Sequence, residues 1–222
     1  MRVEIEILAD AEAVARRGAE LVSAQALAAV ADRGRFTLAV SGGRTPWAMF
    51  AHLAGKMPWE KVTIYQVDER VAPDGDPDRN LTQLERSVPA GGAADVRAMP
   101  VESGDLEEAA AAYASALPPA LDLVHLGLGP DGHTASLIPG DQVLDVVDRD
   151  VAITGAYQGR QRMTLTYPVL NRARQVLWLV TGADKVDALR RLRDGDRSIP
   201  AGRVETREAL ILADEAAAGG SS

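Results

Sequence analysis

Short apolar runs alternate along the chain with longer segments in which apolar residues recur at helical spacing. Asp10 precedes the first such segment and is a residue type that caps helices. Pro46 suits the first position of a second helix, and Pro118-Pro119 would stop an alanine-rich third one. We expect helices at residues 11–30, 46–53, 106–117 and 183–192.

The apolar runs between these segments are short and predict strands, several of them buried on both faces. The first six residues also alternate in the manner of a strand. We expect further strands at residues 36–40, 62–67, 121–128, 151–154, 163–166, 176–180 and 210–212. Strands that alternate with helices imply an α/β fold, with one mostly parallel, Rossmann-like sheet covered by helices on both faces.

The length of 222 residues is enough for one substantial core, and no change in composition marks a linker. We therefore expect a single domain over residues 1–222. The small and polar residues 216–222 are expected to be a disordered tail.

Charge and composition narrow the possible functions. The chain has 24 basic and 32 acidic residues, a net charge of −8, which opposes general binding to nucleic acid or an anionic membrane. It has no cysteine, so disulfides, thiolate metal sites and cysteine nucleophiles are excluded. No apolar run approaches 18 residues, and the start of the chain does not read as a signal peptide. A cytoplasmic location is expected.

Gly127, Gly129 and Gly132 match the spacing of a dinucleotide-binding turn, and acidic residues lie at a suitable distance beyond them. Two features oppose that function. Asp131 would place a carboxylate where the pyrophosphate sits, and residues 133–138 are too few for the crossover helix before the next Pro-Gly pair. We interpret the turn as a different kind of site.

Residues 41–46 read Ser-Gly-Gly-Arg-Thr-Pro and follow an expected strand. Glycines permit close approach of a ligand to the backbone, Thr45 could cap the next helix, and free N–H groups at its start would attract an anion. The Gly-Lys-Ser/Thr ending of a nucleotide loop is absent, so a phosphorylated metabolite fits better. An ordinary strand-to-helix turn is the alternative.

Residues 68–70 read Asp-Glu-Arg and follow the next expected strand. These charges could position a substrate or its attacking water, or they could be a solvated surface cluster. The aspartates in the loop beyond imitate calcium-ligand spacing, but a glycine interrupts them and no glutamate follows at the twelfth position. A solvated turn is the better interpretation of that loop.

His133 is the candidate for acid–base chemistry, because a histidine can take and return a proton near neutral pH. It lies in an Asp-Gly-His turn at a strand end, whereas His52 and His125 are interpreted as structural. Further along, Arg162, Arg160 and Lys185 could bind phosphate oxygens or could be surface charges.

Taken in order, five segments resemble the 6-phosphogluconolactonase family. They are Ser-Gly-Gly-Arg-Thr-Pro at 41–46, Asp-Glu-Arg at 68–70, Gly-Leu-Gly-Pro-Asp-Gly-His-Thr-Ala-Ser-Leu at 127–137, Arg-Met-Thr-Leu-Thr-Tyr-Pro-Val-Leu-Asn at 162–171 and Thr-Gly-Ala-Asp-Lys at 181–185. The resemblance covers nearly the whole chain, and the joint order and spacing of the segments are highly specific.

The resemblance implies hydrolysis of 6-phosphoglucono-δ-lactone to 6-phosphogluconate in the oxidative pentose phosphate pathway, without a metal or cofactor. His133 would be the general base, with Asp131, Arg70 and Asp68 as its catalytic neighbours. The phosphate would be held by Ser41, Gly42, Gly43, Arg44, Thr45, Arg162, Lys185 and, with less support, Arg160. The expected partner is a phosphorylated sugar lactone.

Two alternatives share the resemblance. A glucosamine-6-phosphate deaminase would carry a glutamate five residues after the histidine, where this chain has Ile138, and a tyrosine in place of Arg70. A sugar-phosphate-sensing domain would not need His133. The chain also departs from the lactonase pattern at Arg44, at Ile138 and at Gln158-Gly159-Arg160, where prolines are common.

Overall fold

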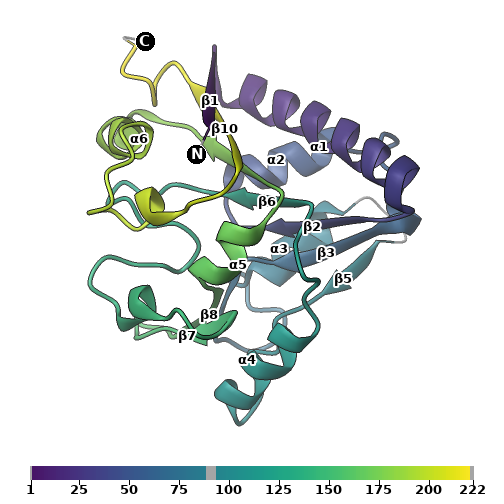
Figure 1. Cartoon of the computed structure of the whole chain (residues 1–222), viewed down its shortest axis with the longest axis vertical. Coiled ribbons are helices and arrows are strands. Elements are labelled where there is room, and N and C mark those ends of the chain that lie inside the picture. The colour runs from purple at the N-terminus through teal and green to yellow at the C-terminus, as the bar shows by residue number, and fades with distance from the viewer. Residues whose placement is uncertain (1, 89–93, 221–222) are drawn as a thin grey trace.

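The structure, a computed structural model, describes residues 2–88 and 94–220. Seven strands form one sheet in which every pairing is parallel. Their spatial order is β1 (Arg2–Leu8), β10 (Glu208–Asp214), β9 (Gln175–Val180), β6 (Leu123–Leu126), β2 (Phe36–Val40), β3 (Val62–Gln66) and β5 (Asp95–Arg97). The predicted mostly parallel sheet is confirmed (Figure 1).

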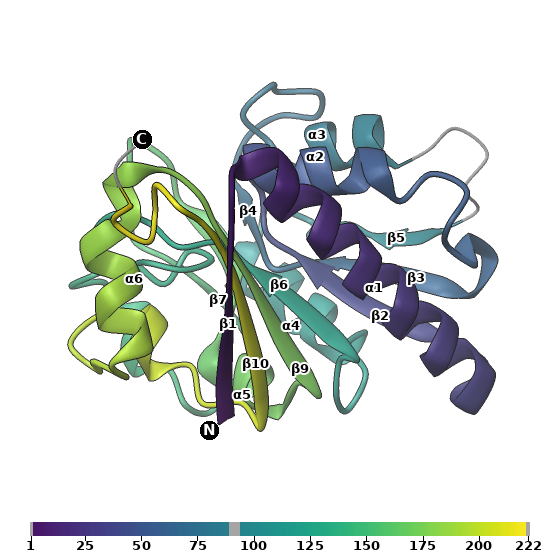
Figure 2. The same cartoon turned by 90° about the horizontal axis from the view of Figure 1, so that it is seen from above.

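Helices pack on both faces of this sheet, as Figures 1 and 2 show. One face carries α1 (Ala11–Arg33), α2 (Arg44–His52) and α3 (Asn80–Ser87), and the other carries α4 (Leu106–Ser115), α5 (Tyr167–Arg172) and α6 (Val186–Arg193). Each face has its own apolar core, so alternate residues of a central strand enter different cores. In β6, Leu123 packs with α1 and α2, whereas Val124 and Leu126 pack with α4 and α5. Burial on both faces explains why these strands read as continuous apolar runs.

A second, three-stranded sheet adjoins the first. It consists of β4 (Asp68–Arg70), β8 (Arg162–Leu165) and β7 (Val151–Ile153), and both of its pairings are antiparallel. The segments expected as strands at 151–154 and 163–166 belong to this second sheet, which the sequence did not distinguish from the parallel one. Strands of three or four residues carry no signal for which partner they pair with, so only the three-dimensional packing assigns them.

Helix α2 begins two residues earlier than expected. Gly43 is its N-cap, with a φ of 140° that favours glycine, so Thr45 is not the cap. The Thr45 hydroxyl lies instead 2.9 Å from the hydroxyl of Thr181. Pro46 falls at the third helical position, where its missing N–H removes no intrahelical hydrogen bond.

Other bounds differ in smaller ways. Helix α1 is capped by Asp10, which accepts a hydrogen bond from Ala13 N at 2.7 Å, as its sequence predicts. Helices α3 and α5 and strands β4 and β5 were not predicted. Near the C-terminus, buried Ala217 donates a 2.7 Å hydrogen bond to Asp214, so turns replace the disorder expected for residues 216–220. Residues 221 and 222 lie outside the described residues.

The turn after β6 confirms that Gly127, Gly129 and Gly132 do not open a dinucleotide-binding helix. The next helical element along the chain is a single 3-10 turn, Gln142–Asp145. These glycines therefore have no helix N-terminus behind them, which is the feature that binds the pyrophosphate in a dinucleotide-binding turn.

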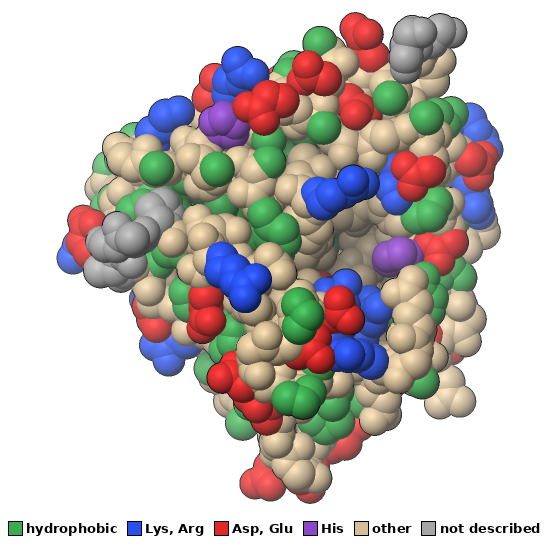
Figure 3. Space-filling view, turned by 180° about the vertical axis from the view of Figure 1, so that it is seen from behind, with side chains coloured by type: hydrophobic (Ala, Val, Ile, Leu, Met, Phe, Trp, Pro, Cys, Tyr) green, Lys and Arg blue, Asp and Glu red, His purple; other side chains and the backbone are tan. Residues whose placement is uncertain are grey.

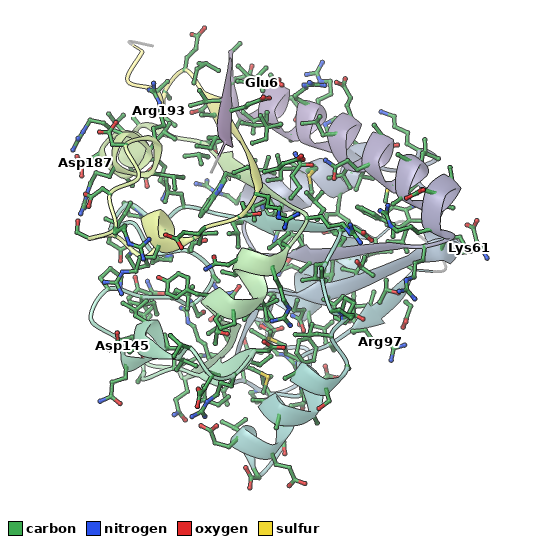
Figure 4. All side chains as sticks on the ribbon, viewed as in Figure 1. Glu6, Lys61, Arg97, Asp145, Asp187 and Arg193 are labelled. Carbon is green, nitrogen blue, oxygen red and sulfur yellow. The ribbon has the colours of Figure 1, made fainter. Side chains whose placement is uncertain are left out.

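Many charged side chains lie at the periphery. Lys61, Arg97 and Asp187, labelled in Figure 4, are exposed and point outward from the ribbon.

Across the described residues, no helix has both the length and the apolar character needed to cross a bilayer.

We expect His125→Leu to make the fold more resistant to acid. Burial in β6 lowers the pKa of His125 from 6.5 to about 3, and the backbone of Ser41 only partly opposes this. The unfolded chain binds a proton below pH 6.5 that the folded chain rejects, so stability is lost as pH falls from about 6.5 toward 3. Between pH 7 and 5.5 the native protein should lose about 1 kcal/mol more unfolding free energy than the variant.

Denaturant titrations of both proteins at the two pH values measure this difference. Because each protein is compared with itself, a general effect of the substitution on stability cancels. If both proteins lost the same unfolding free energy between pH 7 and 5.5, the interpretation of His125 as a neutral, buried imidazole would be contradicted.

Candidate active site

A polar cavity of about 190 Å³ lies where β2 and β6 end and the second sheet begins. This is the edge at which open parallel sheets bind ligands. A neighbouring cavity of about 430 Å³ shares Arg70, Asn80 and Arg162 with the first, so the two are compartments of one cleft. On the same side of the molecule, Figure 3 shows a hollow bordered by basic side chains with a histidine at its edge.

His133 reaches the first cavity from a tight turn. The N–H of Gly129 donates to the carbonyl of His133 at 2.8 Å, and the N–H of Gly132 donates to the carbonyl of Gly129 at 3.0 Å. Gly132 has a φ of 82°, a conformation that favours glycine. At Gly129, a Cβ atom would lie 2.1 Å from Nδ1 of His133. The glycines therefore let the imidazole lie against the backbone.

Asp131 holds that imidazole. Its Oδ1 lies 2.6 Å from Nδ1 of His133 and also accepts a 3.1 Å hydrogen bond from the His133 backbone N–H. Burial would raise the pKa of Asp131, but the backbone N–H, the charge and the ring of His133 together lower it below its usual value. An ionised Asp131 accepts a hydrogen bond from Nδ1–H, which leaves Nε2 as the proton acceptor on a ring that is 24% exposed.

Asp68 is buried, at 4% exposure, yet it lines the same cavity. Its carboxylate accepts hydrogen bonds from the hydroxyls of Ser136 at 2.7 Å and Ser41 at 3.3 Å. The next residue, Glu69, is fully buried. The alternative of a solvated surface cluster is therefore wrong for both carboxylates.

Arg70 lines both compartments from the end of β4. Its Nη1 donates to the backbone carbonyl of Asp78 at 2.6 Å and to Oδ1 of Asn80 at 2.8 Å. Both partners are neutral acceptors. The positive charge of Arg70 therefore remains available to a ligand in the cleft.

Arg162 is the most deeply placed cation of the cleft, at 5% exposure, and it also lines both compartments. Its Nε is buried and has no hydrogen-bond partner, although its Cζ lies 5.0 Å from the centre of the Tyr157 ring. Burial lowers the pKa of Arg162, and nearby Asp68 opposes that shift. An anionic ligand would accept a hydrogen bond from this unsatisfied Nε–H and would balance the buried positive charge.

The other predicted cations occupy different places. Lys185 lines the first compartment, and its Nζ lies 2.9 Å from Asp184. Arg44 and Arg160 line the second compartment, where Arg160 forms a 2.9 Å ion pair with Asp76. That pair shows that the aspartate-rich loop is more than a solvated turn.

The cleft thus brings together most, but not all, of the predicted residues. The first compartment contains Ser41, Gly42, Asp68, Arg70, His133, Arg162 and Lys185, and the second adds Gly43, Arg44 and Arg160. Asp131 lines neither compartment, but it forms hydrogen bonds to His133, which lines the first. Thr45 lines neither compartment, since its hydroxyl bonds to Thr181.

Sequence reasoning missed several residues of the cleft. Asn80 lines both compartments, Ser136 holds Asp68, and Tyr157 packs its ring against His133 with ring centres 6.0 Å apart. Ser136 falls within the Gly-His motif and could have been suspected. Asn80 and Tyr157 lie in segments without a recognisable pattern, so nothing in the sequence separates them from ordinary loop residues.

Fold and cleft together define an α/β protein with a basic ligand site and a histidine–aspartate pair at the carboxyl end of its sheet. The chain belongs to the family of glucosamine-6-phosphate isomerases and 6-phosphogluconolactonases, whose model matches residues 9–212.

Individual proteins of known name are also similar to this chain over most of its length. The chain is 37% identical to a 6-phosphogluconolactonase from Synechocystis, over 85% of this chain and 84% of the relative. It is 34% identical to one from Nostoc, over 99% and 98%. The crystal structure of a 6-phosphogluconolactonase from Thermotoga maritima superposes with a TM-score of 0.84 at 25% identity, covering 96% of this chain and all of that one.

Proposed function

We propose that this protein hydrolyses 6-phosphoglucono-δ-lactone to 6-phosphogluconate, the reaction of the oxidative pentose phosphate pathway. Membership of the family and the names of its relatives support the reaction. The observation that carries it for this chain is the cleft itself. An oriented imidazole and a buried, unsatisfied Arg162 line one compartment, as a substrate with a reactive carbonyl and a distant phosphate requires.

His133 acts as the base and then as the acid. Nε2 takes a proton from water, and the resulting hydroxide adds to the lactone carbonyl. When the tetrahedral intermediate collapses, the bond from the carbonyl carbon to the ring oxygen breaks, and His133 returns its proton to that oxygen. Asp131 keeps the imidazole in the required tautomer and stabilises its protonated form. No covalent intermediate is needed.

Arg70 stabilises the negative charge that develops on the carbonyl oxygen during attack. A donor already in place for that charge typically contributes about 2.7–4 kcal/mol. Asp68, held by two serine hydroxyls, accepts hydrogen bonds from sugar hydroxyls and fixes the orientation of the ring.

The phosphate occupies the part of the cleft formed by Ser41, Gly42 and Gly43, with Arg162 and Lys185 as its cations. Gripping this remote group converts binding energy into correct placement of the carbonyl. Arg44 and Arg160 add positive charge from the second compartment. Thr45 would contribute only through its backbone N–H at the start of α2, because its hydroxyl is engaged elsewhere.

The deaminase alternative is not favoured. Ile138 stands where that activity would use a glutamate, and its apolar side chain is buried at 7% exposure. The chain therefore places no carboxylate there to assist opening of a sugar ring.

The test is a comparison of two lactones with freshly prepared substrate. We expect this protein to hydrolyse the phosphorylated lactone well above its spontaneous rate, and to show a much lower kcat/KM for the unphosphorylated one, since remote binding energy is lost. Equal kcat/KM values would refute the phosphate site, and ammonia release from glucosamine 6-phosphate would support the deaminase. A cytoplasmic location and the lack of a nucleic-acid partner stay predictions.

A further inference from the structure

Asn80, the first residue of α3, is buried at 5% exposure and still lines both compartments of the cleft. The N-cap position belongs to the preceding residue, Arg79, whose side chain makes no capping hydrogen bond. A residue of β4 satisfies the first N–H groups of the helix instead. Glu69 accepts the backbone N–H groups of Asn80 and Leu81, each at 2.7 Å. The side-chain amide of Asn80 is thereby free for another role.

That amide connects two groups of the site. Its Nδ2 donates to the backbone carbonyl of Asp68 at 2.8 Å and lies 3.4 Å from the Asp68 carboxylate, while its Oδ1 accepts from Nη1 of Arg70 at 2.8 Å. It also packs against the phosphate turn, because a Cβ at Gly42 would lie 2.0 Å from the same Oδ1. The amide therefore touches Gly42, Asp68 and Arg70 together.

Only an amide satisfies both neighbours. Its nitrogen donates to Asp68 and its oxygen accepts from Arg70, so each group keeps its own charge. An aspartate at position 80 would form an ion pair with Arg70 and would repel Asp68. Either effect would weaken the interactions that these groups make with a ligand.

We propose that Asn80 is a positioning residue for the reaction, acting through Arg70, an inference that rests on the proposed lactone hydrolysis. By occupying Nη1 together with the Asp78 carbonyl, Asn80 fixes the plane of the guanidinium and turns its remaining donors toward the lactone carbonyl. Its contact with Asp68 also fixes the position of the Asp68 carboxylate, which orients the sugar, relative to the guanidinium of Arg70.

The test is a double-mutant cycle of Asn80→Ala and Arg70→Met, measured by lactone hydrolysis. We expect Asn80→Ala to lower kcat by about 10²-fold with a smaller change in KM, since misplacement of a reacting group by about 1 Å costs that much. In the Arg70→Met background the same substitution should cost almost nothing. Equal losses in both backgrounds would overturn the inference.

Two further measurements separate this outcome from instability and from failure of the proposed function. Leu84→Val weakens the packing of α3 without touching the cleft, so it should lower Tm and leave kcat unchanged. Calorimetric titration with 6-phosphogluconate repeats the cycle without turnover, because Arg70 should also pair with the product carboxylate. Absence of hydrolysis by the native protein would refute the proposed function, while an additive binding cycle would still refute the role of Asn80.

Discussion

His133→Asn should lose about 10²- to 10⁴-fold of kcat for the phosphorylated lactone, the usual contribution of one positioned base. The substitution removes the only group that the proposed mechanism uses to take a proton from water. It retains a polar side chain of similar size beside Asp131, so binding of 6-phosphogluconate should change little. Hydrolysis by ultraviolet or pH-stat assay and binding by calorimetry measure the two effects separately.

His52→Asn is the matched control. His52 lies in α2 and pairs with Glu12 at 2.8 Å, away from both compartments. Its substitution should leave kcat and KM unchanged. The general-base mechanism would be refuted if His133→Asn were fully active. It would also be refuted if His52→Asn lost as much kcat as His133→Asn.

Arg162→Met should lower kcat/KM for the phosphorylated lactone by roughly 10- to 150-fold, equivalent to about 1.5–3 kcal/mol for a hydrogen bond to a charged group. Methionine fills the buried position without leaving an unpaired charge. For the unphosphorylated lactone the same substitution should have little effect. The ratio of the two kcat/KM values therefore reports phosphate recognition and is insensitive to partial loss of folded protein.

Arg160→Met provides the comparison for this experiment. Arg160 borders the second compartment but is already paired with Asp76, so its loss should lower kcat/KM much less. If both substitutions reduced the activity equally, the buried Arg162 would have no special part in holding the phosphate.

The two lactonase motifs that could be read from the sequence differ in how far they predicted the site. The Asp-Gly-His turn is local: its glycines, Asp131 and His133 are within seven residues, so their contact follows from the turn itself. The Ser-Gly-Gly-Arg-Thr-Pro segment is local too, but the sequence did not reveal which of its side chains face the cleft. Thr45 turns away toward Thr181, a residue distant along the chain.

The sequence by itself determined the alternation of helices and strands, the parallel sheet and the edge at which polar turns gather. These follow from period and from short-range caps and turns, which depend on neighbouring residues. Only the tertiary structure decided that β4, β7 and β8 form a separate antiparallel sheet, that Asp68 and Arg162 are buried beside each other, and that Asn80 joins Asp68 to Arg70. Such contacts join residues far apart in sequence, and their energies depend on burial and orientation, which no local pattern encodes.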